Sequence, residues 1–197
     1  MPASPEFLRP RREFRVLVVE DDESSRILTQ ELLLGQHYQV EGAADAEQAE
    51  RIVRERPPDL ILLDVVMPGR SGIELCRELK EDPATRLIPV ILVTGLTERE
   101  ARLQGIEAGA DDFVNKPLDS PELIARVKSL LKLKQFTDEL ENAETVLFSL
   151  ALGVEARDPY TEGHCARLSS YAAQLGQDMG LSEEDNIALR RGGALHD

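Results

Sequence analysis

Cysteine is scarce in this sequence. Only Cys76 and Cys165 are cysteines among 197 residues, and they lie far apart with no C-x-x-C spacing. A disulfide framework is therefore not expected, and the reducing cytoplasm is the default location. No apolar run approaches the roughly 18 residues of a membrane span, and the first residues lack the apolar stretch of a secretory signal. We expect a disordered tail over residues 1–13 and no association with membranes.

Positive charge is limited as well. The chain has 23 Lys and Arg against 37 Asp and Glu, which gives a net charge of −14. Such a surface repels phosphates, so we expect no direct DNA binding and no anionic-membrane surface. A glycine-rich phosphate loop is also missing, which leaves a nucleotide or flavin without its anion cradle. Cation binding and basic partners remain open.

The negative charge is unevenly distributed along the chain. Residues 135–197 carry 4 basic and 12 acidic side chains, a net charge of −8, whereas residues 14–134 carry 16 and 23, a net charge of −7. More than half of the net charge therefore lies in the last third of the sequence. This shift indicates a boundary near residue 135.

Short apolar runs alternate with amphipathic stretches from residue 14 onward. Continuous apolar runs of this length are typical of strands that are buried on both faces of a parallel sheet. The runs are residues 16–19, 60–63 and 90–93, with weaker candidates at Val40 and 113–114. Helix-capping residues and helix-ending Gly or Pro follow each of them. The five repeats predict an α/β domain over 14–134, a flavodoxin-like, doubly wound, five-stranded parallel sheet.

The last helix of this domain is expected to extend beyond the domain. Ser120, Pro121 and Glu122 suit an N-cap and a first helical turn, and no helix breaker follows until about Gly153. Apolar residues then repeat at alternating spacings of three and four: Leu133, Phe136, Leu140, Ala143, Leu147, Leu150 and Val154. This is the a/d pattern of a coiled coil. We expect a helical linker over 135–156 that pairs two copies of the chain, forming a homodimer through the last helix of the α/β domain and the linker.

An amphipathic helix packed on its own domain is the alternative for this segment. Phe148 and Ala151 widen the apolar face, and Glu139, Glu141 and Glu144 would repel one another across a parallel pair. We favour the dimer seam over this alternative.

A partial all-α segment is expected after the long helix. His164, Leu168, Ala172, Leu175 and Met179 share one face at helical spacing, so we expect His164 to face a core. A second helix should begin at Ser182, which has Asp185 at capping distance.

Acidic residues follow the strands of the expected sheet. The first strand ends in Glu20-Asp21-Asp22 and the third in Asp64, while Thr94 and Lys116 follow the fourth and fifth. The carboxyl ends of parallel strands meet at one edge, so these side chains should converge. Converging carboxylates raise one another's pKa unless a cation joins them, and hard oxygen ligands favour Mg²⁺.

This set of side chains suits an aspartate that accepts a phosphoryl group. Asp64 would be the nucleophile, with Mg²⁺ and Lys116 balancing the charge. The alternative is a purely structural role, in which each acid caps the next helix and Lys116 is a surface ion-pair partner. Each residue taken singly allows that interpretation, but the whole set together argues against it.

The sequence resembles response-regulator receiver domains over residues 14–134. The resemblance rests on Val-Leu-Val-Val-Glu20-Asp21-Asp22, Leu-Leu-Asp64-Val-Val-Met-Pro68-Gly69, Val-Thr94-Gly95 and Phe113-Val-Asn-Lys116-Pro117. It implies that Asp64 is the phosphoacceptor and that Glu20, Asp21, Asp64 and the main-chain carbonyl of Val66 organise Mg²⁺. Thr94 and Lys116 would contact the phosphoryl oxygens. Phe113 would be the aromatic switch residue, and the Lys116–Pro117 bond would be cis.

The end of the chain resembles the opening of an HD-GYP domain, a metal-dependent phosphodiesterase family for cyclic di-GMP. The similarity rests on Glu155-Ala-Arg-Asp158-Pro-Tyr-Thr161-Glu-Gly-His164-Cys-Ala-Arg167 and on Ala194-Leu-His196-Asp197. It implies that His164, His196 and Asp197 are metal ligands. The remaining ligands and the GYP segment are absent from residues 157–197, so we expect a truncated module. Fe- or Mn-type metals and cyclic di-GMP would bind only to a complete domain.

The sequence therefore predicts a response regulator that receives a phosphoryl group from a sensor histidine kinase and relays a conformational change to a C-terminal output module. The alternative is a receiver-regulated cyclic di-GMP phosphodiesterase whose catalytic domain is incomplete and inactive in this chain.

Overall fold

The structure, a computed structural model, describes residues 13–95, 99–155 and 163–194. The expected tail lies almost wholly outside these residues, as do His196 and Asp197. The described residues form two compact units, one up to Gln135 and the other from Phe136 onward.

The first unit is built on a five-stranded parallel sheet with the strand order β2-β1-β3-β4-β5. The strands are β1 (Arg15–Val19), β2 (Gln39–Ala43), β3 (Leu60–Asp64), β4 (Val90–Thr94) and β5 (Asp112–Asn115). Every residue of β3 and β4 is buried, which explains their unbroken apolar sequences. The predicted doubly wound α/β fold is confirmed.

Strand β2 has the weakest signal in the sequence. It lies at an edge of the sheet, and its residues alternate between exposed and partly buried up to Ala43. An edge strand with one solvated face needs no apolar run, which is why only Val40 indicated it.

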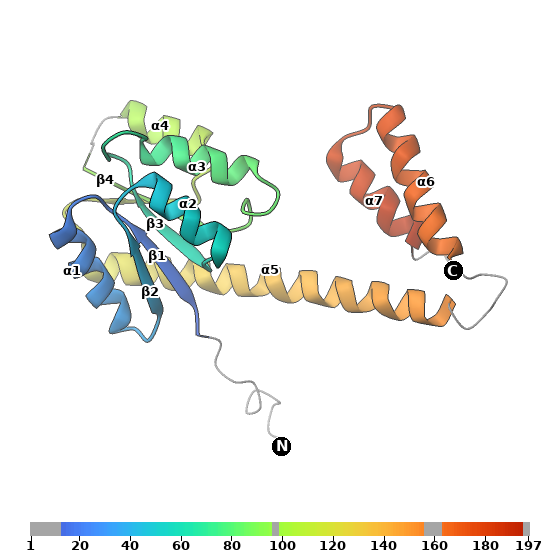
Figure 1. Cartoon of the computed structure of the whole chain (residues 1–197), viewed down its shortest axis with the longest axis horizontal. Coiled ribbons are helices and arrows are strands. Elements are labelled where there is room, and N and C mark those ends of the chain that lie inside the picture. The colour runs from blue at the N-terminus through green and yellow to red at the C-terminus, as the bar shows by residue number, and fades with distance from the viewer. Residues whose placement is uncertain (1–12, 96–98, 156–162, 195–197) are drawn as a thin grey trace, which may run out of the picture. The chain divides into compact units, whose positions relative to one another are not determined.

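Helices cover both faces of the sheet (Figure 1). They are α1 (Glu23–Leu34), α2 (Ala46–Glu55), α3 (Gly72–Glu81), α4 (Arg99–Glu107) and α5 (Ser120–Glu155). Buried residues of α2, α3 and α4 form one core cluster with the sheet, and those of α1 and α5 form the other. Because consecutive strand residues point to opposite faces, each apolar strand contributes to both clusters.

N-cap side chains mark the starts of these helices. Asp45 accepts the backbone N–H of Gln48 at 2.7 Å, and Ser71 and Glu74 form a reciprocal capping box at the start of α3. The predicted start of α5 was one residue late. Asp119 accepts the N–H of Glu122 at 3.4 Å, and Ser120 is already helical.

Helix α5 is continuous over 36 residues and belongs to both units. In its first part, Leu123, Val127 and Leu131 are buried against the sheet. The heptad positions from Leu133 to Leu150 that the structure describes are exposed, and their large apolar side chains have 52–72% of their surface accessible. The side chain of Val154 lies outside the described residues. No helix in the described part of the chain is both long and apolar enough to cross a membrane.

The second unit contains a helical hairpin formed by α6 (His164–Asp178) and α7 (Glu183–Ala194). The two helices approach closely at small residues. A Cβ on Gly193 would lie 2.7 Å from the Cα of Ser169, and one on Gly176 would lie 2.2 Å from Oδ1 of Asn186. The predicted cap of α7 is present, because Asp185 donates its N–H to the Ser182 hydroxyl at 3.1 Å.

Candidate functional site

Four strand ends bring the candidate site together. Glu20 follows β1, Asp64 and Thr94 are the last residues of β3 and β4, and Lys116 follows β5. The register pairs Asp64 with Val93 and Thr94 with Asn115, so the strands end almost level with one another. The parallel topology thus places the four side chains at the same edge of the sheet.

Three carboxylates converge there, as expected from the sequence. One carboxylate oxygen from each of Glu20, Asp21 and Asp64 lies within 4.8 Å of the others. Glu20 and Asp64 are only 6% and 4% exposed, whereas Asp21 faces solvent. Two acids of the cluster are therefore in the protein interior, and the third is at the protein surface.

Lys116 supplies the positive charge that the buried acids need. Its Nζ donates to Oε2 of Glu20 at 2.7 Å and to Oδ2 of Asp64 at 2.8 Å. Burial raises the pKa of Glu20, the hydrogen bond from Lys116 opposes this rise, and the nearby Asp64 charge adds to it. Burial lowers the pKa of Lys116, but the hydrogen bonds to Asp64 and Glu20 outweigh burial and raise it.

The donor set fits a hard divalent cation. All three groups are carboxylates, and Mg²⁺ binds through oxygen ligands while keeping some of its water, for which the exposed Asp21 side leaves access. Asp64 is also oriented by its own loop, because Oδ1 accepts the N–H of Val66 at 3.2 Å. Val66 itself is 58% exposed.

Thr94 and Phe113 lie on the neighbouring strands β4 and β5. Thr94 is 6% exposed, and Phe113 is partly buried against the core cluster of α2, α3 and α4. The Phe113 ring fills the space that a side chain on Gly105 would need, since a Cβ there would lie 2.6 Å from the ring. The guanidinium of Arg102 lies 5.5 Å from the ring centroid. The aromatic side chain thus connects β5 with α4.

The Lys116–Pro117 peptide bond is cis, as the resemblance implied. Asp22, beside the acidic pair, caps α1 instead of joining the cluster: it accepts the N–H of Ser25 at 2.8 Å, and this hydrogen bond lowers the pKa of Asp22.

Sequence analysis did not identify Gly72, which supports the loop after Asp64. A Cβ on Gly72 would lie 2.0 Å from the carbonyl oxygen of Asp64, so only glycine lets α3 approach the end of β3 this closely. Glycine at the start of a helix was a visible signal, although its partner could not be read from the sequence.

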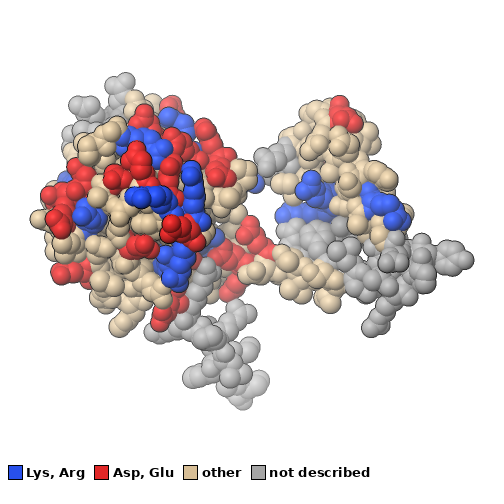
Figure 2. All heavy atoms as spheres, in the orientation of Figure 1, with Lys and Arg blue, Asp and Glu red and all other residues tan. Residues whose placement is uncertain are grey.

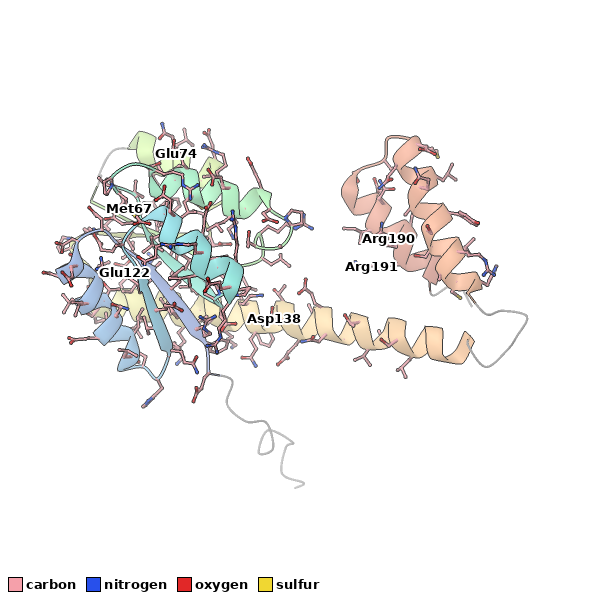
Figure 3. All side chains as sticks on the ribbon, viewed as in Figure 1. Met67, Glu74, Glu122, Asp138, Arg190 and Arg191 are labelled. Atoms are coloured by element: carbon pink, nitrogen blue, oxygen red, sulfur yellow. The ribbon has the colours of Figure 1, made fainter. Side chains whose placement is uncertain are left out.

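Two arginines near the site were missed for the same reason. Arg70, in the loop between β3 and α3, bridges Glu50 of α2 at 2.9 Å and Glu78 of α3 at 2.8 Å. Arg26 of α1 donates to the backbone of the acidic pair. Met67, labelled in Figure 3, anchors the same loop as Arg70 with a side chain that is 8% exposed.

The expectation that His164 faces a core is wrong. His164 is exposed, and the buried residues of α6 are Cys165, Ala173 and Gly176. The contact with α7 is made through small residues one helical position away from the predicted face. His196 and Asp197 lie outside the described residues, so the predicted grouping of these two residues with His164 stays a prediction.

Comparison with known proteins gives a consistent result for the first unit. A family model described as the response regulator receiver domain matches residues 16–128. The response regulator PleD of Caulobacter vibrioides is 47% identical over 130 residues, which are 66% of this chain and 29% of that protein. A crystal structure of a putative response regulator from Chloroflexus aurantiacus has a TM-score of 0.59 and 33% identity, and covers 61% of this chain and 99% of its own.

One relative extends past the first unit. A probable cyclic di-GMP phosphodiesterase of Vibrio cholerae is 33% identical over 187 residues, which are 85% of this chain and 42% of that protein. The chain therefore spans less than half the length of either of these two curated relatives.

Proposed function

The chain belongs to the family of response regulator receiver domains, and from this we propose that it accepts a phosphoryl group on Asp64 from a sensor histidine kinase. The observation that supports the proposal most strongly is the convergence of Glu20, Asp21 and Asp64 beside the Lys116 ammonium. The two cysteines form no disulfide, which suits the cytoplasm, where we propose that this transfer takes place.

In the proposed reaction, a carboxylate oxygen of Asp64 attacks the phosphorus of a phosphohistidine. The new O–P bond forms as the P–N bond breaks, and the electron pair of that bond returns to the histidine of the kinase. A bound Mg²⁺, held by Glu20, Asp21, Asp64 and the Val66 carbonyl, would neutralise the charge of the phosphoryl oxygens. Lys116 would move its hydrogen bond from the Asp64 carboxylate to the phosphoryl group, and Thr94 would donate a hydrogen bond to the same group.

We further propose that the output passes through α5. Phe113 pairs with Leu92, which lies two residues before Thr94 and on the same face of the sheet, and its ring packs against Gly105 of α4. A movement of Thr94 toward the phosphoryl group would therefore alter the packing of Phe113. Since α5 packs on the sheet at Leu123 and continues without a break to Glu155, a shift of its first turns would be transmitted along its whole length.

The exposed heptad positions on α5 support a homodimer. Large apolar side chains at 52–72% exposure along one helical seam are stabilised when a second copy covers them. In the heptad pattern Glu139 and Glu144 flank this seam at g and e positions, so salt should strengthen a parallel pairing by screening their repulsion.

The second candidate function is a cyclic di-GMP phosphodiesterase of the HD-GYP family. It is favoured by the Vibrio cholerae relative, whose similarity extends past Gln135. In this candidate, His164, His196 and Asp197 would hold Fe- or Mn-type metals within a complete domain. A bimetallic centre needs more ligands than these three residues supply.

Phosphorylation with acetyl phosphate and Mg²⁺ tests the main proposal. Intact-mass analysis should show one phosphoryl group on the wild type and none on Asp64→Asn. Asp22→Asn is the matched control, because asparagine caps a helix as well as aspartate does and Asp22 lies outside the cluster. Equal labelling of wild type and Asp64→Asn would refute the assignment. Turnover of cyclic di-GMP by this chain with Mn²⁺, abolished by His196→Ala, would instead support the phosphodiesterase.

A further inference from the structure

We propose that Arg26 is a positioning residue for Mg²⁺, because it fixes the backbone on which Glu20 and Asp21 are carried. The inference rests on the proposed function, since it concerns the same metal site. Arg26 lies on α1, and its guanidinium reaches back across the start of the helix. Nη1 donates to the carbonyl oxygen of Glu20 at 2.6 Å and to that of Asp21 at 3.3 Å.

The acidic segment needs such support because few other contacts hold it. The N–H of Glu20 donates to Ala43 at 3.0 Å, which ties the end of β1 to β2. Asp22 is fixed as the cap of α1. Between these two points the carbonyls of Glu20 and Asp21 lie where the chain leaves the sheet, and Arg26 donates to both. One nitrogen with two hydrogens thus links consecutive peptide groups of the pair.

Positioning of this kind governs metal affinity. Glu20 is 6% exposed and Asp21 is exposed, so one carboxylate approaches the cluster from the interior and the other from solvent. A rotation of the peptide between them would separate oxygens that now lie within 4.8 Å. Groups that orient metal ligands without touching the metal commonly contribute a factor of about 10–100 to affinity.

Gly42 on β2 provides the space that this arginine requires. A Cβ at Gly42 would lie 3.2 Å from Cδ of Arg26 and 2.8 Å from Nε2 of Gln30. Gly42 pairs with Val18 on β1, two residues before Glu20. A larger residue at 42 would therefore press on the Arg26 side chain.

Calorimetric titration of Mg²⁺ tests the proposal without any phosphoryl transfer. We expect Arg26→Ala to weaken Mg²⁺ binding by roughly tenfold and Arg26→Lys, which keeps a charge and a donor, to recover part of the loss. Arg54→Ala is the control, because Arg54 is a 78% exposed arginine whose ion pair is with Glu50 of the same helix. Thermal unfolding without Mg²⁺ shows that each variant is folded before it is titrated.

Gly42→Ala gives a second approach if Arg26→Ala does not fold. We expect Gly42→Ala to weaken Mg²⁺ binding by itself. Where Arg26→Ala folds, Gly42→Ala should weaken binding less than Arg26→Ala does and have no further effect in the Arg26→Ala background, because both changes act through one side chain. Gln30→Ala should not restore binding to Gly42→Ala, since Gln30 donates no hydrogen bond to the acidic segment among the described contacts.

The outcomes separate this inference from the proposed function. Folded Arg26→Ala protein that binds Mg²⁺ as tightly as the wild type would overturn the role of Arg26 and leave the phosphoacceptor site standing. Additive losses in Gly42→Ala and Arg26→Ala would overturn it as well. A wild type that binds no Mg²⁺ would overturn both.

Discussion

At the scale of single residues, Lys116 has the largest electrostatic role. It joins two carboxylates that are each less than a tenth exposed. Without its ammonium, these charges would face one another across a site with little solvent. Their ionisation then depends on a cation from solution, which couples the stability of the fold to Mg²⁺.

Removing this charge should therefore destabilise the metal-free protein. We expect Lys116→Ala to lower the free energy of unfolding at neutral pH by about 1–3 kcal/mol, which is the cost of leaving buried polar groups unpaired. Since burial raises the pKa of Glu20, the folded state takes up a proton before the unfolded chain does as pH falls. The loss of unfolding free energy in Lys116→Ala should thus become smaller at low pH, and Mg²⁺ should also reduce this loss. Urea unfolding at several pH values measures both effects, and a loss that does not depend on pH would contradict this account.

Cys76 should be inert toward thiol reagents in the folded protein. Its side chain is 0% exposed, and burial raises the pKa of the thiol to about 11. The thiolate is the reactive species, so modification at pH 8 should require unfolding. Because the unfolded thiol ionises first, stability should fall as pH rises from about 9 toward 11. Ellman's reagent with and without urea measures this, using Cys76→Ala to separate Cys76 from Cys165. Rapid labelling of native Cys76 would disprove it.

At the scale of elements, the contact of α3 with β3 sets the position of the phosphoacceptor. Gly72→Ala would place a methyl group 2.0 Å from the Asp64 carbonyl oxygen, so helix and strand must separate. We expect a loss of stability of about 1–3 kcal/mol from overpacking and slower phosphorylation by acetyl phosphate.

Gly95→Ala is the matched control for this change. Gly95 also follows a strand that ends at the site, but a Cβ there would meet no atom of the described residues within 4 Å. It should unfold like the wild type. If Gly72→Ala is phosphorylated at the wild-type rate, the close approach of α3 does not position Asp64.

The sequence predicted those elements whose burial is uniform and those site residues that follow strand ends. Strands β3 and β4 were clear because both faces are covered, and the convergence of Glu20, Asp21 and Asp64 followed from parallel topology. Arg26, Arg70 and Gly72 could not be predicted, because their roles depend on atoms of other elements brought near by folding.

The same reasoning explains the error at His164. Its helical face was deduced from apolar spacing, but the buried residues of α6 are Cys165, Ala173 and Gly176, and α6 approaches α7 most closely at Gly176 and Ser169. In a hairpin of two helices, close backbone approach at glycine determines the buried face more than side-chain size does. Leu175 and Met179 remain 60% and 66% exposed in consequence.

At the scale of the whole molecule, charged side chains are interspersed, whereas exposed apolar side chains are concentrated in one part of the chain. Acidic and basic side chains are interspersed over the visible face of the first unit in Figure 2, so this face offers no broad field of one sign. The apolar surface is concentrated on α5 beyond Leu131 and on the hairpin, where a groove of about 700 Å³ is lined by Leu168, Leu181 and Leu189 among others. Association of copies should therefore depend on the helices that follow the sheet.

Leu140 gives the most direct test of that association. It is 72% exposed and occupies the middle of the heptad seam, so Leu140→Lys should change the stability of a monomer by less than about 0.5 kcal/mol. In a dimer it would place two ammonium groups in the centre of the interface. Analytical ultracentrifugation should show that wild-type dimers are strengthened by salt and that Leu140→Lys is monomeric.

Leu28→Lys is the matched control, because Leu28 is a 69% exposed leucine that belongs to α1 and not to the heptad seam. If phosphorylation acts through α5, acetyl phosphate should shift the monomer–dimer equilibrium of the wild type and of Leu28→Lys, and leave Leu140→Lys unchanged. If Leu140→Lys is still a dimer, the interface does not lie along this seam. Signal output would then have to reach the partner through another surface of the chain.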